Sequence, residues 1–210
     1  MIFQVSEEIT IKEGFHQAFY KEEDFEILMS QMNKGVMLDK HKHEHKQFAF
    51  CFDGKVNFIV ENKEYILEKN MSCLIKEDLE HFASSDEDFY VLDFKYIDSS
   101  EVELSPLRKI IPNREIDICD LTLANHKLFK ITSQTEMASI NLEKNTDFDY
   151  YLVVGKQTKI LNVGSEMDLY PMKIYKVDGN SNDELELKIK NSNEELHIIQ
   201  ICRGIDSYDF

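Results

Sequence analysis

Short apolar segments separated by polar turn signals fill the first hundred residues of the chain. Residues 47–54 (QFAFCFDG) are rich in aromatic side chains and end in an Asp-Gly turn signal, after which residues 55–60 (KVNFIV) continue as a second apolar segment. This pair is typical of a β-hairpin. Residues 64–67 and 71–75 follow at close spacing, and a polar turn leads on to His81. The pattern predicts an antiparallel barrel or sandwich rather than a helical domain.

The segment at residues 47–54 also predicts how this strand is covered. Gln47, Ala49 and Cys51 share one face, and the phenylalanines between them share the other. Both faces are largely apolar, so both are expected to be covered. A second sheet of the same chain or another subunit would provide the cover, which makes a homodimer a candidate assembly.

The second half of the chain echoes the first. An apolar segment at residues 149–155 corresponds to the one that ends at Gly54, and residues 196–201 correspond to residues 89–94. A chain of 210 residues with 42% hydrophobic residues can bury two cores of about 100 residues each. We therefore expect two β-barrels in tandem.

The expected boundaries follow from these segments. Residues 1–98 form the N-terminal barrel, residues 99–127 the connector, and residues 128–210 the C-terminal barrel. Residues 1–24 are expected to supply strands that cover a sheet edge or reach across to the second barrel, because unpaired edges invite aggregation.

A short helix is predicted within the connector. Ser105 can cap it and Pro106 suits its first position, while Pro112 would end it after about two turns. This helix would act as a spacer.

Charge and composition exclude several classes of partner. The net charge of -16 repels phosphate backbones and anionic membrane surfaces, so direct binding of nucleic acid is disfavoured. No apolar run approaches the about 20 residues that cross a bilayer, and the first residues do not resemble a signal peptide. We expect a cytoplasmic protein without a membrane or nucleic-acid partner.

The four cysteines do not form a recognisable pair. They are Cys51, Cys73, Cys119 and Cys202, and no two of them have Cys-x-x-Cys spacing. This distribution indicates reduced thiols rather than a zinc knuckle or a disulfide framework.

Histidines carry the strongest chemical signal. His41 and His43 lie two residues apart, so one extended strand would point both imidazoles to the same side. Gln47 can join them if the residues between form a turn into the next strand, and His81 follows downstream. The alternative is a solvated turn, because His41, His43 and His45 stand among lysines and a glutamate that need no metal.

The spacing of Gly35, His41, His43, Gln47 and Gly54 reads Gly-x5-His-x-His-x3-Gln-x6-Gly. It resembles the first motif of the cupin superfamily, small β-barrels that often hold one metal ion, with glutamine in the position of the family's glutamate. The resemblance implies an all-β chain of two cupin-type antiparallel barrels of the jelly-roll or double-stranded β-helix type. It also implies a metal site, with His81 added to His41, His43 and Gln47, in the N-terminal barrel. His45 is the alternative fourth ligand.

The family's second motif, Gly-x5-Pro-x-Gly-x2-His-x3-Asn, is matched only in spacing. Its positions are occupied by Asn70, Lys76, Asp78, His81 and Ser85. Asn70 and Asp78 stand where the family has glycine, and both residue types tolerate left-handed backbone better than most.

The C-terminal barrel is expected to lack this metal site. Counting from Gly155 as from Gly54 places Leu142, Lys144 and Phe148 where His41, His43 and Gln47 stand, and Asn182 where His81 stands. A structural role, or binding of a ligand without a metal, would remain for this barrel.

Three imidazoles and an amide oxygen would leave a divalent ion with its positive charge and with open positions. Such an ion is a Lewis acid for small molecules that chelate through adjacent oxygens. Fe(II) would permit dioxygen chemistry, whereas Mn, Ni, Co or Zn would favour isomerase or lyase chemistry. An amide cannot exchange protons as a glutamate can, and no catalytic base is identified.

Two functions therefore remain open. The first is a metal-dependent enzyme acting on a small oxygenated substrate. The second is a non-catalytic module that binds or senses a small organic ligand, because the first barrel also resembles the effector half of AraC-type regulators. The segment at residues 196–202 is strand-like, whereas such regulators carry a helix-turn-helix domain.

Overall fold

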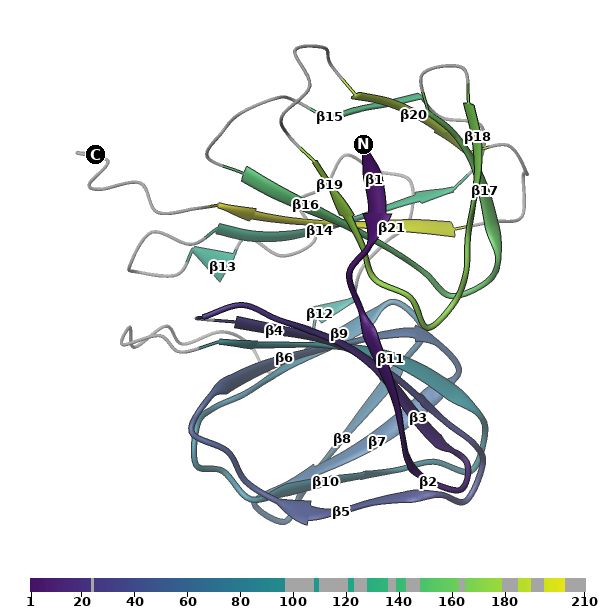
Figure 1. The fold of residues 1–210 in the computed structure, drawn as a ribbon. Coiled ribbons are helices and arrows are strands. Elements are labelled where there is room, and N and C mark those ends of the chain that lie inside the picture. The colour runs from purple at the N-terminus through teal and green to yellow at the C-terminus, as the bar shows by residue number, and fades with distance from the viewer. Residues whose placement is uncertain are drawn as a thin grey trace, which may run out of the picture. The chain divides into compact units, whose positions relative to one another are not determined.

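A computed structural model describes residues 1–23, 25–96, 108–109, 121–122, 128–135, 139–142, 148–162, 165–178, 185–189 and 195–202. Its contacts divide the chain into two compact units. One is Ser6–Ile110, here called the N-terminal unit, and the other combines Met1–Val5 with Ile111–Phe210, here called the C-terminal unit. The described elements of both are β-strands (Figure 1). Among the described residues, no helix is long and apolar enough to cross a membrane.

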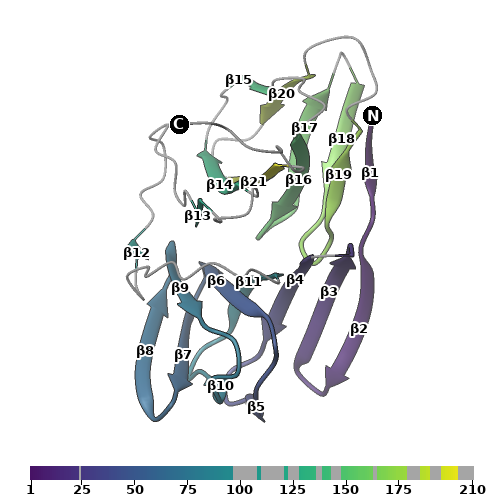
Figure 2. The ribbon, with the colours of Figure 1, turned by 90° about the vertical axis from the view of Figure 1, so that its left-hand side faces the viewer.

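The N-terminal unit consists of two antiparallel sheets. The larger has seven strands in the order β12-β9-β6-β11-β4-β3-β2, and the smaller has four in the order β5-β10-β7-β8. Figure 2 shows β2, β3 and β4 side by side at one end of the larger sheet. The strands are β2 Glu7–Lys12, β3 Phe15–Lys21, β4 Phe25–Met32, β5 Met37–His41, β6 Lys46–Asp53, β7 Lys55–Val60, β8 Lys63–Glu68, β9 Met71–Ile75, β10 His81–Ser84, β11 Phe89–Tyr96 and β12 Arg108–Lys109.

The C-terminal unit repeats this topology. Its sheets run β1-β19-β16-β21-β14-β13 and β15-β20-β17-β18. Strands β19, β16, β21 and β14 thus take the places of β9, β6, β11 and β4, and the four-stranded sheets match strand for strand. The strands are β1 Ile2–Gln4, β13 Leu121–Thr122, β14 Leu128–Thr135, β15 Ser139–Leu142, β16 Phe148–Val154, β17 Thr158–Asn162, β18 Ser165–Leu169, β19 Tyr175–Val177, β20 Leu185–Ile189 and β21 Glu195–Cys202. The prediction of two tandem all-β barrels is confirmed.

The predicted hairpin over residues 47–60 is wrong in its pairing, although both strands exist. β6 pairs with β9 and β11, whereas β7 pairs with β8 and β10 in the other sheet. Gly54 lies at this change of sheet with φ 75°, a left-handed conformation that glycine adopts without steric cost. The Asp-Gly turn therefore passes the chain from one sheet to the other.

The predicted connector helix is also wrong where the structure describes it. Arg108 and Lys109 form a short strand that pairs with Ser72 and Met71 at the edge of β9. The open backbone groups of this edge offer hydrogen bonds that a helix would not use. Ser105, Pro106 and Pro112 lie outside the described residues.

The core of the N-terminal unit lies between its two sheets. Ala49, Cys51, Phe89 and Val91 face it from the larger sheet and Phe58 from the smaller. The intervening phenylalanines of β6 are buried as well, so both faces of this strand are covered as predicted. These buried phenylalanines are Phe48, Phe50 and Phe52.

Left-handed backbone occurs at the turn positions that the second motif suggested. Asn70 has φ 65° and Asp78 has φ 59°, in the two places where the family has glycine. Gly35 likewise has φ 78°. The turns are therefore preserved although the glycines of that motif are not.

We predict that Gly54→Ala destabilises the N-terminal unit by about 3 kcal/mol, because strain and collision add. A Cβ at Gly54 would collide with the carbonyl oxygen of Asp88 and lie 3.0 Å from Cα of Phe89. Gly35→Ala is the matched control, because Gly35 also has positive φ but a Cβ added there would meet no atom within 4 Å. It should cost about 1 kcal/mol. Urea unfolding checks both, and equal costs would contradict the role given to Asp88.

Candidate functional site

The four-stranded sheet brings His41 and His81 together. His41 ends β5 and His81 begins β10, and these two residues are direct partners in the antiparallel ladder. Their ring centroids are 4.3 Å apart. His81 is fully buried, whereas His41 is partly exposed. The pairing of β5 with β10 thus brings together two histidines that are 40 residues apart in the sequence.

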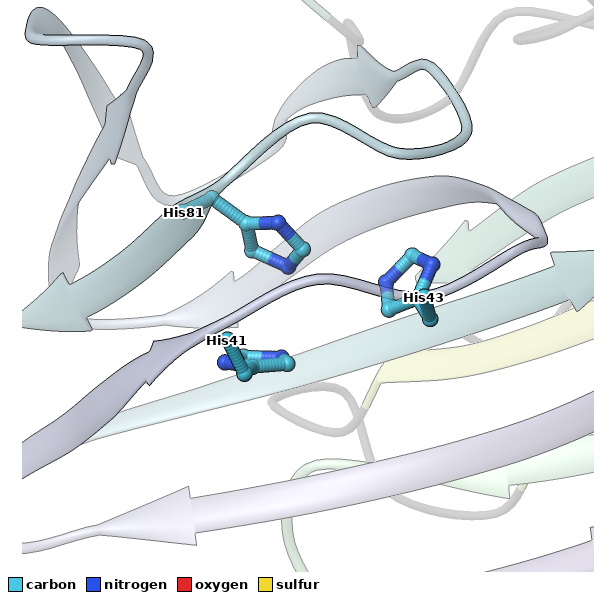
Figure 3. Close-up of side chains that lie close together, drawn as sticks. All are labelled: His41, His43 and His81. Carbon is cyan, nitrogen blue, oxygen red and sulfur yellow. The ribbon is translucent and has the colours of Figure 1, made fainter.

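His43 completes the group from the loop after β5. Its ring centroid lies 4.9 Å from that of His81 and 5.9 Å from that of His41. The Asp78 N–H donates to the carbonyl of His43 at 2.9 Å and so joins this loop to the turn before His81. One nitrogen from each of the three rings lies within 4.8 Å of the others. Figure 3 shows the three rings around a common space, and such a group can hold a metal ion.

Backbone carbonyls set the protonation of all three rings. Nδ1 of His41 lies 2.9 Å from the carbonyl oxygen of Asp39, and Nδ1 of His81 lies 2.9 Å from that of Leu79. Nδ1 of His43 lies 2.7 Å from the carbonyl oxygen of His45. A carbonyl only accepts, so each Nδ1 carries the proton and donates it. Each neutral ring then presents the lone pair of Nε2, which is the form that binds metals.

The buried Nε2 of His81 is the clearest sign of a missing partner. It has no hydrogen bond within the described structure. Burial lowers the pKa of His81 to about 4, and the neighbouring His41 and His43 act in the same direction. The ring is therefore neutral at pH 7, with an unused lone pair that costs free energy unless something binds it. A divalent cation fits this donor set.

Gln47 and Asp93 extend the hydrogen-bonded group beyond the imidazoles: Gln47 contacts His43, and Asp93 contacts Gln47. The Gln47 Nε2 donates to Oδ1 of Asp93 at 2.7 Å, which leaves Oε1 of Gln47 2.8 Å from Nε2 of His43. With the His43 proton on Nδ1, two lone pairs face each other across this distance. A proton or a cation between them would remove the repulsion. Burial lowers the pKa of His43, so the imidazolium is disfavoured and a cation is the better solution.

Asp93 was not anticipated from the sequence. It interrupts the apolar run of β11, lies on the cavity side of that strand and is buried. Burial raises the pKa of Asp93 to about 6, while the charge of Lys95 and the Gln47 hydrogen bond lower it. An acidic residue within an otherwise apolar strand was the available signal.

His45 lies beside the group rather than in it. Its ring centroid is 6.3 Å from that of His43, and its backbone carbonyl accepts the His43 proton. Cys51 is also outside the group: its thiol donates to the carbonyls of Asp53 and Gly54, and burial raises its pKa to about 12. Cys51 and Cys73 are free thiols, as predicted.

The C-terminal unit differs at the equivalent ladder position. Leu142 pairs with Leu185 at the start of β20, as His41 pairs with His81. The register thus corrects the count that placed Asn182 opposite Leu142. Leu142 is buried in the core of that unit, whereas Lys144 and Asn182 lie outside the described residues.

Comparison with solved structures identifies the fold. The bacterial pirin YhhW from Escherichia coli, in complex with nickel(II), has a TM-score of 0.69 at 10% identity, covering 97% of this chain and all of that one. Oxalate decarboxylase from Bacillus subtilis, described with Mn(II) centres, has a TM-score of 0.62 at 10% identity over 99% of this chain and 78% of that one. A cupin 2 conserved barrel domain protein from Leptotrichia buccalis has a TM-score of 0.54 at 12% identity over 96% and 98%.

These likenesses confirm the cupin fold of the chain. No protein-family model matches the sequence, and no curated protein is similar enough to be matched. At such identities the comparisons concern architecture, so function has to be argued from the site.

We predict that metal-free protein loses stability between pH 7 and pH 4.5 through His81. The pKa of His81 is about 4 in the folded protein against 6.5 for an ordinary histidine, so the unfolded chain takes up the proton first. Its contribution is present above pH 6.5 and is lost as the pH falls toward 4, about 2 kcal/mol by pH 4.5. Urea unfolding of wild type and His81→Gln, both treated with chelator, measures this difference. Asp93 titrates in both proteins, so its contribution cancels in the difference. If the free energy of unfolding depended on pH equally in both proteins, the loss would not come from His81.

We predict that Gln47→Glu destabilises metal-free protein by about 2–4 kcal/mol at pH 7. The substitution removes the donor to Asp93 and buries a second carboxylate against it. Asp93→Asn in the same chain should recover most of this loss, because its amide can donate to Glu at position 47. A double-mutant cycle by chemical denaturation measures the coupling. Additive losses would show that the two side chains do not interact.

Proposed function

We propose that this protein binds one divalent metal ion through His41, His43 and His81, with Gln47 as fourth ligand, and acts as a metal-dependent enzyme on a small oxygenated molecule. The carrying observation is the buried Nε2 of His81, which faces the other two rings and has no hydrogen-bond partner in the described structure. The nickel(II) complex of the bacterial pirin and the Mn(II) centres of oxalate decarboxylase support metal binding by this fold.

The residues present suit such an ion. Three neutral imidazoles and an amide oxygen bring no negative charge of their own, and the buried carboxylate of Asp93 lies directly behind the amide. A bound divalent ion would supply Lewis-acid polarisation of a substrate oxygen. His41 and Gln47 also line a cavity inside the barrel, so a small molecule has access to the same side chains. Oxygenation, isomerisation and lyase chemistry are all compatible with this arrangement.

One observation favours a sensing module as the second candidate. The buried carboxylate of Asp93 contacts the imidazoles through Gln47, which donates to Asp93 and places its Oε1 2.8 Å from Nε2 of His43. A general base that touches substrate is therefore not evident. A protein that binds both ion and ligand without turnover would have this second function.

We predict near-stoichiometric uptake of one divalent ion per chain by tag-free protein, measured by elemental analysis after incubation and desalting. His43→Ala and His81→Ala should each lose most of the metal, because either change removes one of three neutral nitrogen ligands. His16→Ala is the matched control: His16 is exposed and bonds Thr10 instead, so its metal content should stay at the wild-type level. Wild-type protein that remains empty after exposure to Mn, Fe, Co, Ni and Zn would overturn the proposal.

A further inference from the structure

The cavity of the N-terminal unit has a polar end at the imidazole group and a lining that is otherwise mostly apolar. It is partly open and has a volume of about 230 Å³. His41, Gln47, Asp93 and Lys95 line it together with the hydrogen-bonded pair Gln17 and Ser30. The other lining side chains are apolar and come from both sheets. These include Phe15, Leu28, Met32, Leu38, Phe58, Phe89 and Val91. A ligand that fills this space must be small and must combine a polar head with an apolar body.

Lys95 brings a cation to the polar end. It lies on β11 directly opposite Gln47 of β6, two residues beyond Asp93 on the same face of the strand. Its charge lowers the pKa of His43, of His81 and of Asp93. The ammonium group therefore acts on His43 and His81 as well as on Asp93, although it is not one of the metal ligands.

The charge of Lys95 acts on two carboxylates, Glu26 and Asp93, each of which is bonded to another side chain. Glu26 is opposite Lys95 on β4, but its carboxylate pairs with Lys21 at 2.6 Å. Asp93 accepts the hydrogen bond of Gln47. Within the described residues Lys95 makes no ion pair of its own, so the cavity holds a cation whose natural complement is an anionic group of a ligand.

We propose that the ligand of this barrel is a small monocarboxylate with an oxo or hydroxyl group on the adjacent carbon and an apolar body. Lys95 binds the carboxylate, the adjacent oxygen faces the imidazole group, and the body occupies the space between Phe15, Phe58 and Phe89. This rests on the proposed metal site, because the adjacent oxygen is meant for the ion. Gln17 and Ser30 bond each other, so a second carboxylate would meet mostly apolar side chains and is disfavoured by desolvation.

Calorimetric titration of metal-loaded, full-length protein tests this assignment. The probes are 2-hydroxy-4-methylpentanoate, its primary amide, and malate, which carries a second carboxylate in place of the branched body. The monocarboxylate should bind about tenfold or more tightly than the amide, as expected for one charge-assisted contact, and more tightly than malate. Lys95→Met should remove the preference for acid over amide, and Lys95→Arg should keep it.

Two controls separate the possible failures. Lys63→Met removes an exposed lysine of β8 that does not line the cavity and should leave the preference for acid unchanged. Elemental analysis of every variant confirms its metal content. Loaded wild type that binds acid and amide equally, or binds no probe at millimolar concentration, overturns the ligand assignment alone. A preference that persists in Lys95→Met overturns the role of Lys95. Protein that takes up no metal overturns the proposed function itself.

Discussion

Three hydrogen bonds between imidazole rings and the backbone determine what this site can do. The carbonyls of Asp39, His45 and Leu79 each accept an Nδ1 proton, and in every case the carbonyl is two residues from its histidine. These bonds favour the tautomer with the proton on Nδ1 and leave a lone pair on Nε2 of His41 and of His81, while Nε2 of His43 lies against Oε1 of Gln47. Without these bonds the rings could satisfy one another by hydrogen bonding. With them, the lone pair of His81 remains buried and unused.

A glutamine at position 47 suits the hydrogen bonds of this site, because its amide can both donate and accept. Asp93 is buried one strand away and needs a donor, which the Gln47 amide provides. A glutamate at that position would face Asp93 with like charge. With glutamine in the position of the motif's glutamate, the negative charge is carried by Asp93, which is separated from the imidazoles by the Gln47 amide. Lys95 also lines the cavity, and its charge lowers the pKa of Asp93.

Local patterns predicted most strands and the histidine group, because alternation, turn residues and strand register are short-range properties. Asn70 and Asp78 show this well, since their side chains tolerate the left-handed turns in which they lie. Pairing partners were harder to predict: the chain changes sheet at Gly54, and Arg108 joins an open strand edge. Both depend on residues far away in sequence. Asp93 was missed because its role depends on the strand that brings Gln47 beside it.

Long-range ¹H–¹⁵N correlation NMR of metal-free protein at neutral pH reveals which nitrogen of each imidazole carries the proton. The two ring nitrogens of a histidine have distinct shifts, and protonation separates them further. We expect protonated Nδ1 and unprotonated Nε2 for His41, His43 and His81, assigned through single substitutions. The Nε2 signals should shift when a diamagnetic ion such as Zn²⁺ is added. A protonated Nε2 on His81, or signals that ignore the ion, would contradict this expectation.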